Sequence, residues 1–184
     1  MRSRLLALAA LATSVLASSA NAQSVMVGGE AMYPAKDIVS NAVNSRDHTT
    51  LLAAVKAAGL VETLQGKGPF TVFAPINGAF AALPAGTVET LLKPENKRTL
   101  SSVLTYHVVA GRLTARDIIA AIRKGNGTAT FTTVNGQTLT AMLNGPMNVA
   151  LRDASGGIFN ISTYDVLQSN GVIHVTDHVL LPKM

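Results

Sequence analysis

Tyr106 and His107 are adjacent in this chain of 184 residues and place a phenol beside an imidazole. Both groups donate and accept hydrogen bonds, and an imidazole changes its charge near neutral pH. The pair lies where a helical pattern ends and a strand pattern begins, and polar groups at such junctions either satisfy backbone groups or are exposed for recognition. Two roles therefore stay open, a structural one and contact with a partner, and neither needs catalysis.

His174 and His178 are four residues apart, which is the spacing of two metal ligands on one face of a helix. The residues around them favour a strand instead, and an extended chain would separate the two side chains by roughly 13 Å. One ion cannot bridge that distance. We therefore expect no metal site here.

Motifs that mark common enzyme classes are missing from the sequence. There is no Gly-x-Ser-x-Gly elbow, no glycine-rich phosphate loop, no zincin motif and no cysteine. Asp165 and Asp177 could form a glycosidase-like pair only if the fold brought them together. We expect a protein without enzymatic activity and without a cofactor, and a hydrolase is kept as an alternative.

Residues 1–22 have the features of a secretory signal peptide. Arg2 and Arg4 precede an apolar run from Leu5 to Leu16, and Ala20-Asn21-Ala22 supplies the small-residue cleavage pattern. Since the apolar run is well short of the roughly 20 residues that span a bilayer, no transmembrane segment is expected. The sequence predicts a secreted protein that is periplasmic or extracellular.

The charge distribution argues against a nucleic-acid partner. The 15 basic residues exceed the 10 acidic ones only slightly once Arg2 and Arg4 are removed with the signal peptide. The remaining basic residues are scattered, with Lys97-Arg98 and Arg123-Lys124 as the only adjacent pairs. A nucleic-acid surface would concentrate such residues on one face.

The first half of the chain after the signal peptide reads as mostly helical. Residues 23–35 contain glycines and lack periodicity, so we expect a flexible leader there. Asp47 is the expected N-cap of a helix that ends at Gly59. One face of this helix carries Leu51, Leu52, Val55 and Ala58.

A short buried strand is expected at residues 70–74, where strand-favouring residues precede Pro75. Asn77 then stands in position to cap a short helix over residues 78–83. Thr114 and Asp117 have capping-box spacing before a further helix that closes at Gly125.

From residue 128 onward, the pattern changes to short runs rich in Thr, Val, Ile and Phe. Asn-Gly and Gly-Gly pairs separate these runs and are typical of hairpin turns. Leu139, Ala141 and Leu143 alternate with polar residues, which predicts one face on the core and one in solvent. The second half therefore reads as antiparallel sheet, and the fold class as α+β.

Three motifs resemble those of the fasciclin (FAS1) domain family. Residues 70–80, Phe-Thr-Val-Phe-Ala-Pro-Ile-Asn-Gly-Ala-Phe, are similar to the first family signature, and residues 170–182 resemble the second. Tyr106-His107-Val108-Val109 resembles the Tyr-His motif between them. Ile76 and Gly78 depart from the family pattern, which commonly has Thr or Ser and an acidic residue at these positions.

The resemblance implies a single domain over residues 36–184, built as a wedge of mostly antiparallel β-strands with helices from the N-terminal half packed alongside. It also implies a role in adhesion to a cell surface or extracellular matrix, with a protein or polysaccharide partner. We further expect the protein to be a monomer. Tyr106, His107 and Asn77 are then the expected partner-binding residues. A carrier of a small hydrophobic ligand or lipid is the alternative, because 48% of the residues are hydrophobic.

Overall fold

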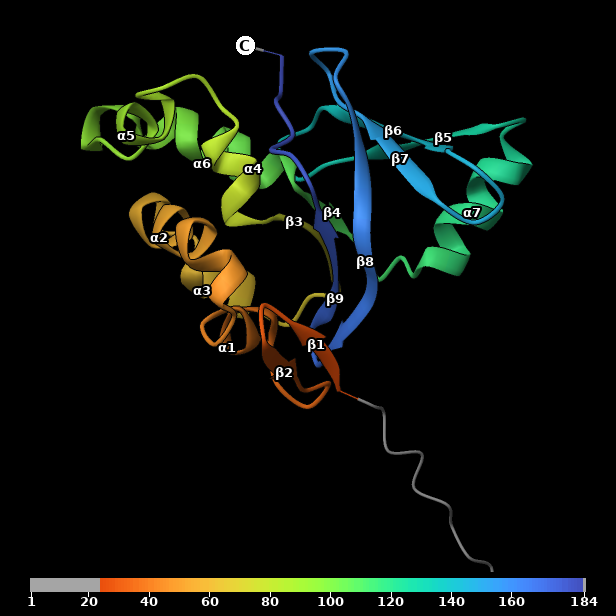
Figure 1. Ribbon diagram of the computed structural model, residues 1–184, viewed down its shortest axis with the longest axis horizontal. Coiled ribbons are helices and arrows are strands. Elements are labelled where there is room, and N and C mark those ends of the chain that lie inside the picture. The colour runs from red at the N-terminus through yellow and green to blue at the C-terminus, as the bar shows by residue number, and fades with distance from the viewer. Residues whose placement is uncertain (1–23, 184) are drawn as a thin grey trace, which may run out of the picture.

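The computed structural model describes residues 24–183, which form a layer of helices beside a curved sheet (Figure 1). The signal-peptide prediction falls on residues outside this range. The elements in chain order are β1 (Val25–Val27), β2 (Glu30–Met32), α1 (Ile38–Ala42), η1 (Arg46–His48), α2 (Thr49–Ala58), α3 (Val61–Gln65), β3 (Phe70–Pro75), α4 (Asn77–Ala81), α5 (Thr87–Leu91), η2 (Pro94–Asn96), α6 (Lys97–Tyr106), β4 (Val108–Ala110), α7 (Ala115–Lys124), β5 (Thr128–Thr132), β6 (Thr138–Leu143), β7 (Val149–Arg152), β8 (Ile158–Gln168) and β9 (Gly171–Thr176). No helix within residues 24–183 is both long enough and apolar enough to cross a membrane.

The main sheet has seven strands in the order β4-β3-β9-β8-β7-β6-β5. All neighbours are antiparallel except β3 and β9, which pair in parallel from Phe70 opposite Gly171 to Pro75 opposite Thr176. A bridge between Val109 and Thr133 brings the two ends of the sheet together, so the sheet curls upon itself. The predicted α+β class and mostly antiparallel sheet are confirmed.

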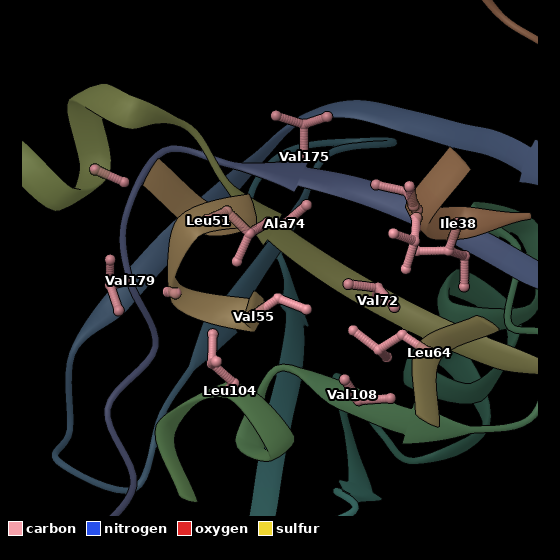
Figure 2. Packing of buried hydrophobic residues seen from close by; sticks show 14 of the residues in the cluster. Ile38, Leu51, Val55, Leu64, Val72, Ala74, Leu104, Val108, Val175 and Val179 are labelled. Atoms are coloured by element: carbon pink, nitrogen blue, oxygen red, sulfur yellow. The ribbon is translucent and has the colours of Figure 1, made fainter. Parts of the chain in front are cut away.

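Two hydrophobic clusters stabilise this arrangement. The larger one lies between the N-terminal helices and strands β3, β4 and β9, as Figure 2 shows. The smaller one lies between α7 and strands β5 to β8, on the other side of the molecule in Figure 1. Leu139 and Ala141 are fully buried in the smaller cluster, as their alternation with polar residues predicts.

Residues 25–32 form a β-hairpin, so the prediction of a flexible leader at residues 23–35 is wrong for this segment. Val27 and Met32 are buried in the larger cluster. Gly28 and Gly29 adopt positive φ angles at the turn, where glycine costs little. Val27 and Met32 anchor the hairpin to the core, because their burial removes apolar surface from water.

The cap of α2 comes from a distant residue rather than from Asp47. Gly59 ends the helix with φ 73°, as predicted, but no side chain of the preceding turn caps its start. Asn77 Oδ1 instead accepts hydrogen bonds from the Thr50 backbone N–H (3.0 Å) and the Thr49 hydroxyl (3.2 Å). The prediction for Asp47 is wrong, and that for Asn77 is wrong as to the helix, since Asn77 caps α2 and not α4.

Asn170 and Gly171 join the helical layer to the sheet. The Asn170 side chain accepts from the Ile38 N–H (3.0 Å) and donates to the Leu64 and Gly66 carbonyls (2.8 and 2.9 Å). Gly171 packs so closely on β3 that a Cβ atom would lie 2.1 Å from the Phe70 carbonyl oxygen. The close parallel pairing of β3 and β9 therefore requires glycine at residue 171.

The capping box at the start of α7 is present as predicted. Thr114 Oγ1 accepts from the Asp117 N–H (3.3 Å), and Asp117 Oδ2 accepts from the Thr114 N–H (2.9 Å). These reciprocal bonds satisfy backbone donors that a helix start leaves free. Helix α7 then places Ile118, Ile119 and Ile122 in the smaller cluster.

Candidate functional site

The Tyr106 side chain is completely buried at the end of α6. Its hydroxyl donates to the Thr138 carbonyl (2.8 Å) and accepts from the Ala154 N–H (2.8 Å). Burial raises the pKa of Tyr106, so the phenol is uncharged at neutral pH. Tyr106 therefore connects α6 to β6 and to the turn after β7.

His107 is the C-terminal cap of α6 and is 2% exposed. Its Nδ1 lies 2.8 Å from the Val103 carbonyl oxygen, and its Nε2 lies 2.9 Å from the Leu180 backbone nitrogen. Because a carbonyl only accepts and an N–H only donates, the proton is on Nδ1 and Nε2 is the acceptor. Burial lowers the pKa of His107 to about 4, which keeps the ring neutral in this role.

Asp153 is a third buried polar residue beside Tyr106 and His107, and no sequence pattern singled it out. Its Oδ2 accepts from the Leu181 N–H (2.9 Å). Its Oδ1 accepts from the backbone of Ser155 (3.0 Å) and Gly157 (2.9 Å) and from the Ser155 hydroxyl (2.7 Å). Asp153-Ala-Ser-Gly-Gly is rich in residues that favour turns, so the turn was detectable, whereas the bond to Leu181 was not.

Residues 178–183, called the C-terminal segment below, are held in place by these buried groups; Val179, Leu180 and Pro182 are buried, whereas His178 and Lys183 are exposed. His107 and Asp153 accept the N–H groups of Leu180 and Leu181. Gln137 adds two bonds to Lys183, one from the Lys183 N–H (2.8 Å) and one to its carbonyl (2.9 Å). An irregular segment is thereby fixed through its backbone, which leaves exposed side chains free for contacts.

A surface groove of about 250 Å³ lies between α6 and the C-terminal segment. Arg98 and Lys183 are exposed on its two sides. Val103 and Pro182 form the apolar part of the groove wall, and Thr99 and Ser102 contribute hydroxyl groups. The groove combines positive charge with neutral hydrogen-bonding groups, which suits anionic groups on a polymer.

Asn77 is the first residue of α4, just after β3. Its side chain is occupied by α2 and by the Arg46 carbonyl, to which Nδ2 donates (2.8 Å). The Ile76 N–H bonds to the Thr176 carbonyl (3.3 Å), so the link between β3 and α4 lies beside the residues that lead into the segment. Ile76 occupies the N-cap of α4 and makes no side-chain cap bond.

The side chains of the three predicted site residues are buried or engaged with the protein's own groups: Tyr106 and His107 bond at the end of α6, and Asn77 bonds to η1 and α2. The structural role considered for Tyr106 and His107 accounts for all of their hydrogen bonds. Direct partner contact by Tyr106, His107 and Asn77 stays a prediction; the bonds in this geometry join α6 to the sheet and to the C-terminal segment through Tyr106 and His107, and join η1 and α2 to the start of α4 through Asn77.

The other chemistry-bearing residues are not brought together. His174 lies in strand β9, as expected, and its Nε2 lies 2.8 Å from the Leu113 carbonyl, whereas His178 lies beyond the end of the strand at Thr176. Asp177 bonds to Asn160 of β8. Asp165 lies five residues after Asn160 in the same strand and accepts from the Ala115 N–H. That separation is roughly 16 Å along the strand, beyond the spacing of a glycosidase pair.

We predict that stability falls as the pH decreases from 6.5 towards 4. His107 takes up its proton near pH 6.5 in the unfolded chain but only near pH 4 in the folded one, so its contribution is complete above 6.5 and is lost as the pH falls through this window. Burial likewise lowers the pKa values of His48 and His174, which changes stability in the same direction.

The size of this effect follows from the pKa of His107. Between pH 7.5 and pH 5, it lowers the free energy of unfolding by about 2 kcal/mol, which urea titrations at the two pH values can measure. The variant His107→Gln retains hydrogen-bonding groups without this titration and should show a smaller difference. Equal stability of the wild-type protein at both pH values would contradict the assignment.

Both the sequence and the fold are similar to those of known proteins. The sequence profile described as Fasciclin domain matches residues 46–182. Protein sll1483 of Synechocystis sp. (strain ATCC 27184 / PCC 6803 / Kazusa) is 47% identical over 162 residues, which are 88% of this chain and 82% of that protein. Immunogenic protein MPB70 of Mycobacterium bovis is 34% identical over 146 residues, which are 77% of this chain and 66% of the relative.

The fold also resembles a solved structure, that of a FAS1 domain pair from the insect cell adhesion molecule Fasciclin I. The TM-score is 0.70 at 17% identity, and the match covers 79% of this chain and 51% of that one. The profile match includes Tyr106, His107, Asp153 and the C-terminal segment as far as Pro182.

Proposed function

The chain belongs to the fasciclin domain family, and on this basis we propose that it is an exported adhesion protein without enzymatic activity. It binds a protein or polysaccharide of a cell surface or extracellular matrix, and it acts as a monomer. The description of Fasciclin I as a cell adhesion molecule supports this role. The signal-like residues 1–22 support export to the periplasm or beyond.

The observation that carries the proposal is the backbone anchoring of the C-terminal segment beside a basic groove. Buried His107 and Asp153 determine where the segment lies, and the exposed Arg98 and Lys183 face solvent along the groove. A binding surface benefits from such preorganisation, because less conformational freedom is lost on association. Anionic groups of the partner are the natural ligands of this groove.

The same observation favours binding over catalysis. The imidazoles of His107 and His174, the Tyr106 phenol and the Asp153 carboxylate all bond to backbone groups of the protein itself. A general acid or base must instead reach a substrate proton. In the proposed function, Tyr106 and His107 position the contact surface through these bonds, and direct contact of Tyr106, His107 or Asn77 with the partner remains a part of the proposal that variants of each residue can test.

We predict that reversing the charge of the groove weakens binding to the producing cells and their extracellular polymers. The double variant Arg98→Glu/Lys183→Glu should bind at least about tenfold more weakly than the wild-type protein, because attraction becomes repulsion. The matched control is Lys67→Glu/Arg116→Glu, which makes the same change in net charge at exposed positions outside the groove. A dissociation constant from a saturation binding assay is the readout.

The assay distinguishes an error in the choice of contact surface from an error in the adhesion proposal. If wild-type protein binds and both double variants bind equally well, the groove is not the contact surface. If wild-type protein binds neither cells nor polymers, the adhesion proposal itself is wrong. Thermal unfolding of each variant shows whether a loss of binding reflects a loss of folded protein.

A further inference from the structure

The dipeptide Asn-Gly occurs five times in this sequence, and it carries a chemistry that needs no enzyme. The backbone nitrogen of the glycine can attack the side-chain amide carbon of the asparagine, because glycine has no side chain to obstruct the approach. Since the reaction is intramolecular, its rate depends on whether the fold lets the two groups reach one another. The five asparagines are Asn77, Asn126, Asn135, Asn144 and Asn170.

The side chains of Asn77 and Asn170 are held by distant backbone groups. Asn170 is 7% exposed and bonds to three backbone groups of the helical layer. Asn77 bonds to the start of α2 through Oδ1 and to the Arg46 carbonyl through Nδ2. In both residues the oxygen and the nitrogen of the amide are engaged, so the side chain cannot rotate toward the following glycine without losing these bonds.

At Asn126 and Asn135, the attacking nitrogen itself is engaged. The N–H of the glycine after Asn135 donates to the Thr133 carbonyl (2.9 Å), and that of the glycine after Asn126 donates to the Ile122 carbonyl (3.0 Å). A backbone nitrogen must lose its proton to become a nucleophile, and here it must first leave its acceptor. The fold therefore slows the reaction at these two sites as well.

Asn144 has neither of these constraints. It begins the turn between β6 and β7, and residues 144–148 of this turn are all exposed. Its side chain makes a single bond at the surface, from Nδ2 to Asn160 Oδ1 (3.2 Å). The Gly145 N–H has no hydrogen-bond acceptor within residues 24–183. Both reacting groups are therefore accessible, and neither has to break a buried bond.

We propose that Asn144 is a site of spontaneous deamidation, with the Gly145 backbone nitrogen as the nucleophile. A solvent base removes the proton of this nitrogen, a bond forms between the nitrogen and Cγ of Asn144, and the Cγ–Nδ2 bond breaks to release ammonia. Water then opens the resulting succinimide ring at one of its two carbonyl carbons, which gives aspartate or isoaspartate. No group is oxidised or reduced. This inference is independent of the adhesion function.

The product changes the charge of this surface. A carboxylate only accepts hydrogen bonds, so it cannot replace the Nδ2 group that donates to Asn160 Oδ1. Asn160 Nδ2 already lies 3.3 Å from Asp177 Oδ2. Deamidation of Asn144 therefore adds a second negative charge beside Asn160 and makes a neutral turn acidic.

The test is incubation of the purified protein at pH 8, followed by digestion and mass spectrometry of the five Asn-Gly peptides. The same protein unfolded in guanidinium chloride is the reference, because the fold no longer restrains any of the five pairs. In the folded protein, Asn144 should react within about threefold of its unfolded rate, whereas Asn170 should be slowed at least about tenfold. Slowing of Asn144 as large as that of Asn170, or a faster reaction at any other asparagine of the folded protein, would overturn the proposal.

The variant Asn144→Gln tests the site within the folded protein. Glutamine keeps the amide but would have to form a larger ring, so the acidic form that ion-exchange chromatography separates from aged wild-type protein should be absent from the aged variant. Asn126→Gln is the matched control, since Asn126 is also exposed and precedes a glycine. Its acidic form should accumulate as in the wild-type protein. Persistence of the acidic form at wild-type amounts in Asn144→Gln would also overturn the proposal.

Discussion

Replacement of His107 with alanine is expected to lower the free energy of unfolding by about 4 kcal/mol, the largest effect of any single change proposed for this protein. The substitution leaves the Val103 carbonyl and the Leu180 N–H without their partner in the interior. It also leaves a cavity where a fully buried ring was packed. Urea unfolding at pH 7.5 measures the change.

The control for this experiment is His178→Ala. The His178 side chain is 51% exposed, pairs with Asp177 and stacks on Phe159 at the surface. Exposed pairs of this kind contribute about 0–1 kcal/mol, so the control should remain close to the wild-type protein. Equal losses for the two histidine variants would show that His107 does not anchor the C-terminal segment.

Replacement of Asp153 with alanine is expected to cost about 3 kcal/mol, because it removes the acceptor of four hydrogen bonds at a residue that is 5% exposed. Asp153→Asn keeps one acceptor oxygen and should lose about half as much. Chemical denaturation of both variants gives the two values. Amide hydrogen exchange at Leu181 should accelerate in the alanine variant as its N–H loses its partner.

Asp47→Ala is the corresponding control, since Asp47 is exposed and provides no helix cap. Its stability should stay within about 0.5 kcal/mol of the wild-type protein. A loss at Asp47 as large as that at Asp153 would contradict the structural assignment of both carboxylates.

Much of the fold was predictable because it depends on neighbours in sequence. The stripe of apolar residues predicts α2, and Gly59 predicts its end because glycine tolerates the left-handed backbone found there. Thr114 with Asp117 predicts the start of α7. Each of these signals acts within one or two helical turns. The alternation around Leu139 likewise predicts which face of β6 is buried.

Features that depend on distant residues were not predictable in the same way. Asp47 has the local features of a cap, but Asn77, 27 residues after Thr50, provides it. The hairpin at residues 25–32 has no periodicity of its own and is ordered by burial of Val27 and Met32 in the common core. Tertiary packing overrides local propensity in both cases.

In the candidate site, too, local patterns predict some features, and others depend on distant residues. The position of Tyr106 and His107 at the junction of a helix and a strand follows from local patterns, and the structure confirms it. Their partners do not follow from such patterns, because Leu180 lies 73 residues from His107 and Ala154 lies 48 residues from Tyr106. Only the folded chain brings these groups together.

The most direct test of the adhesion proposal is a saturation binding curve of the purified protein on its own producing cells, measured beside the Arg98→Glu/Lys183→Glu variant. The proposal predicts a saturable curve for the wild-type protein that shifts to higher concentration when the groove charge is reversed. A wild-type curve that never saturates, or that is no higher than for an unrelated protein of the same charge, would contradict it.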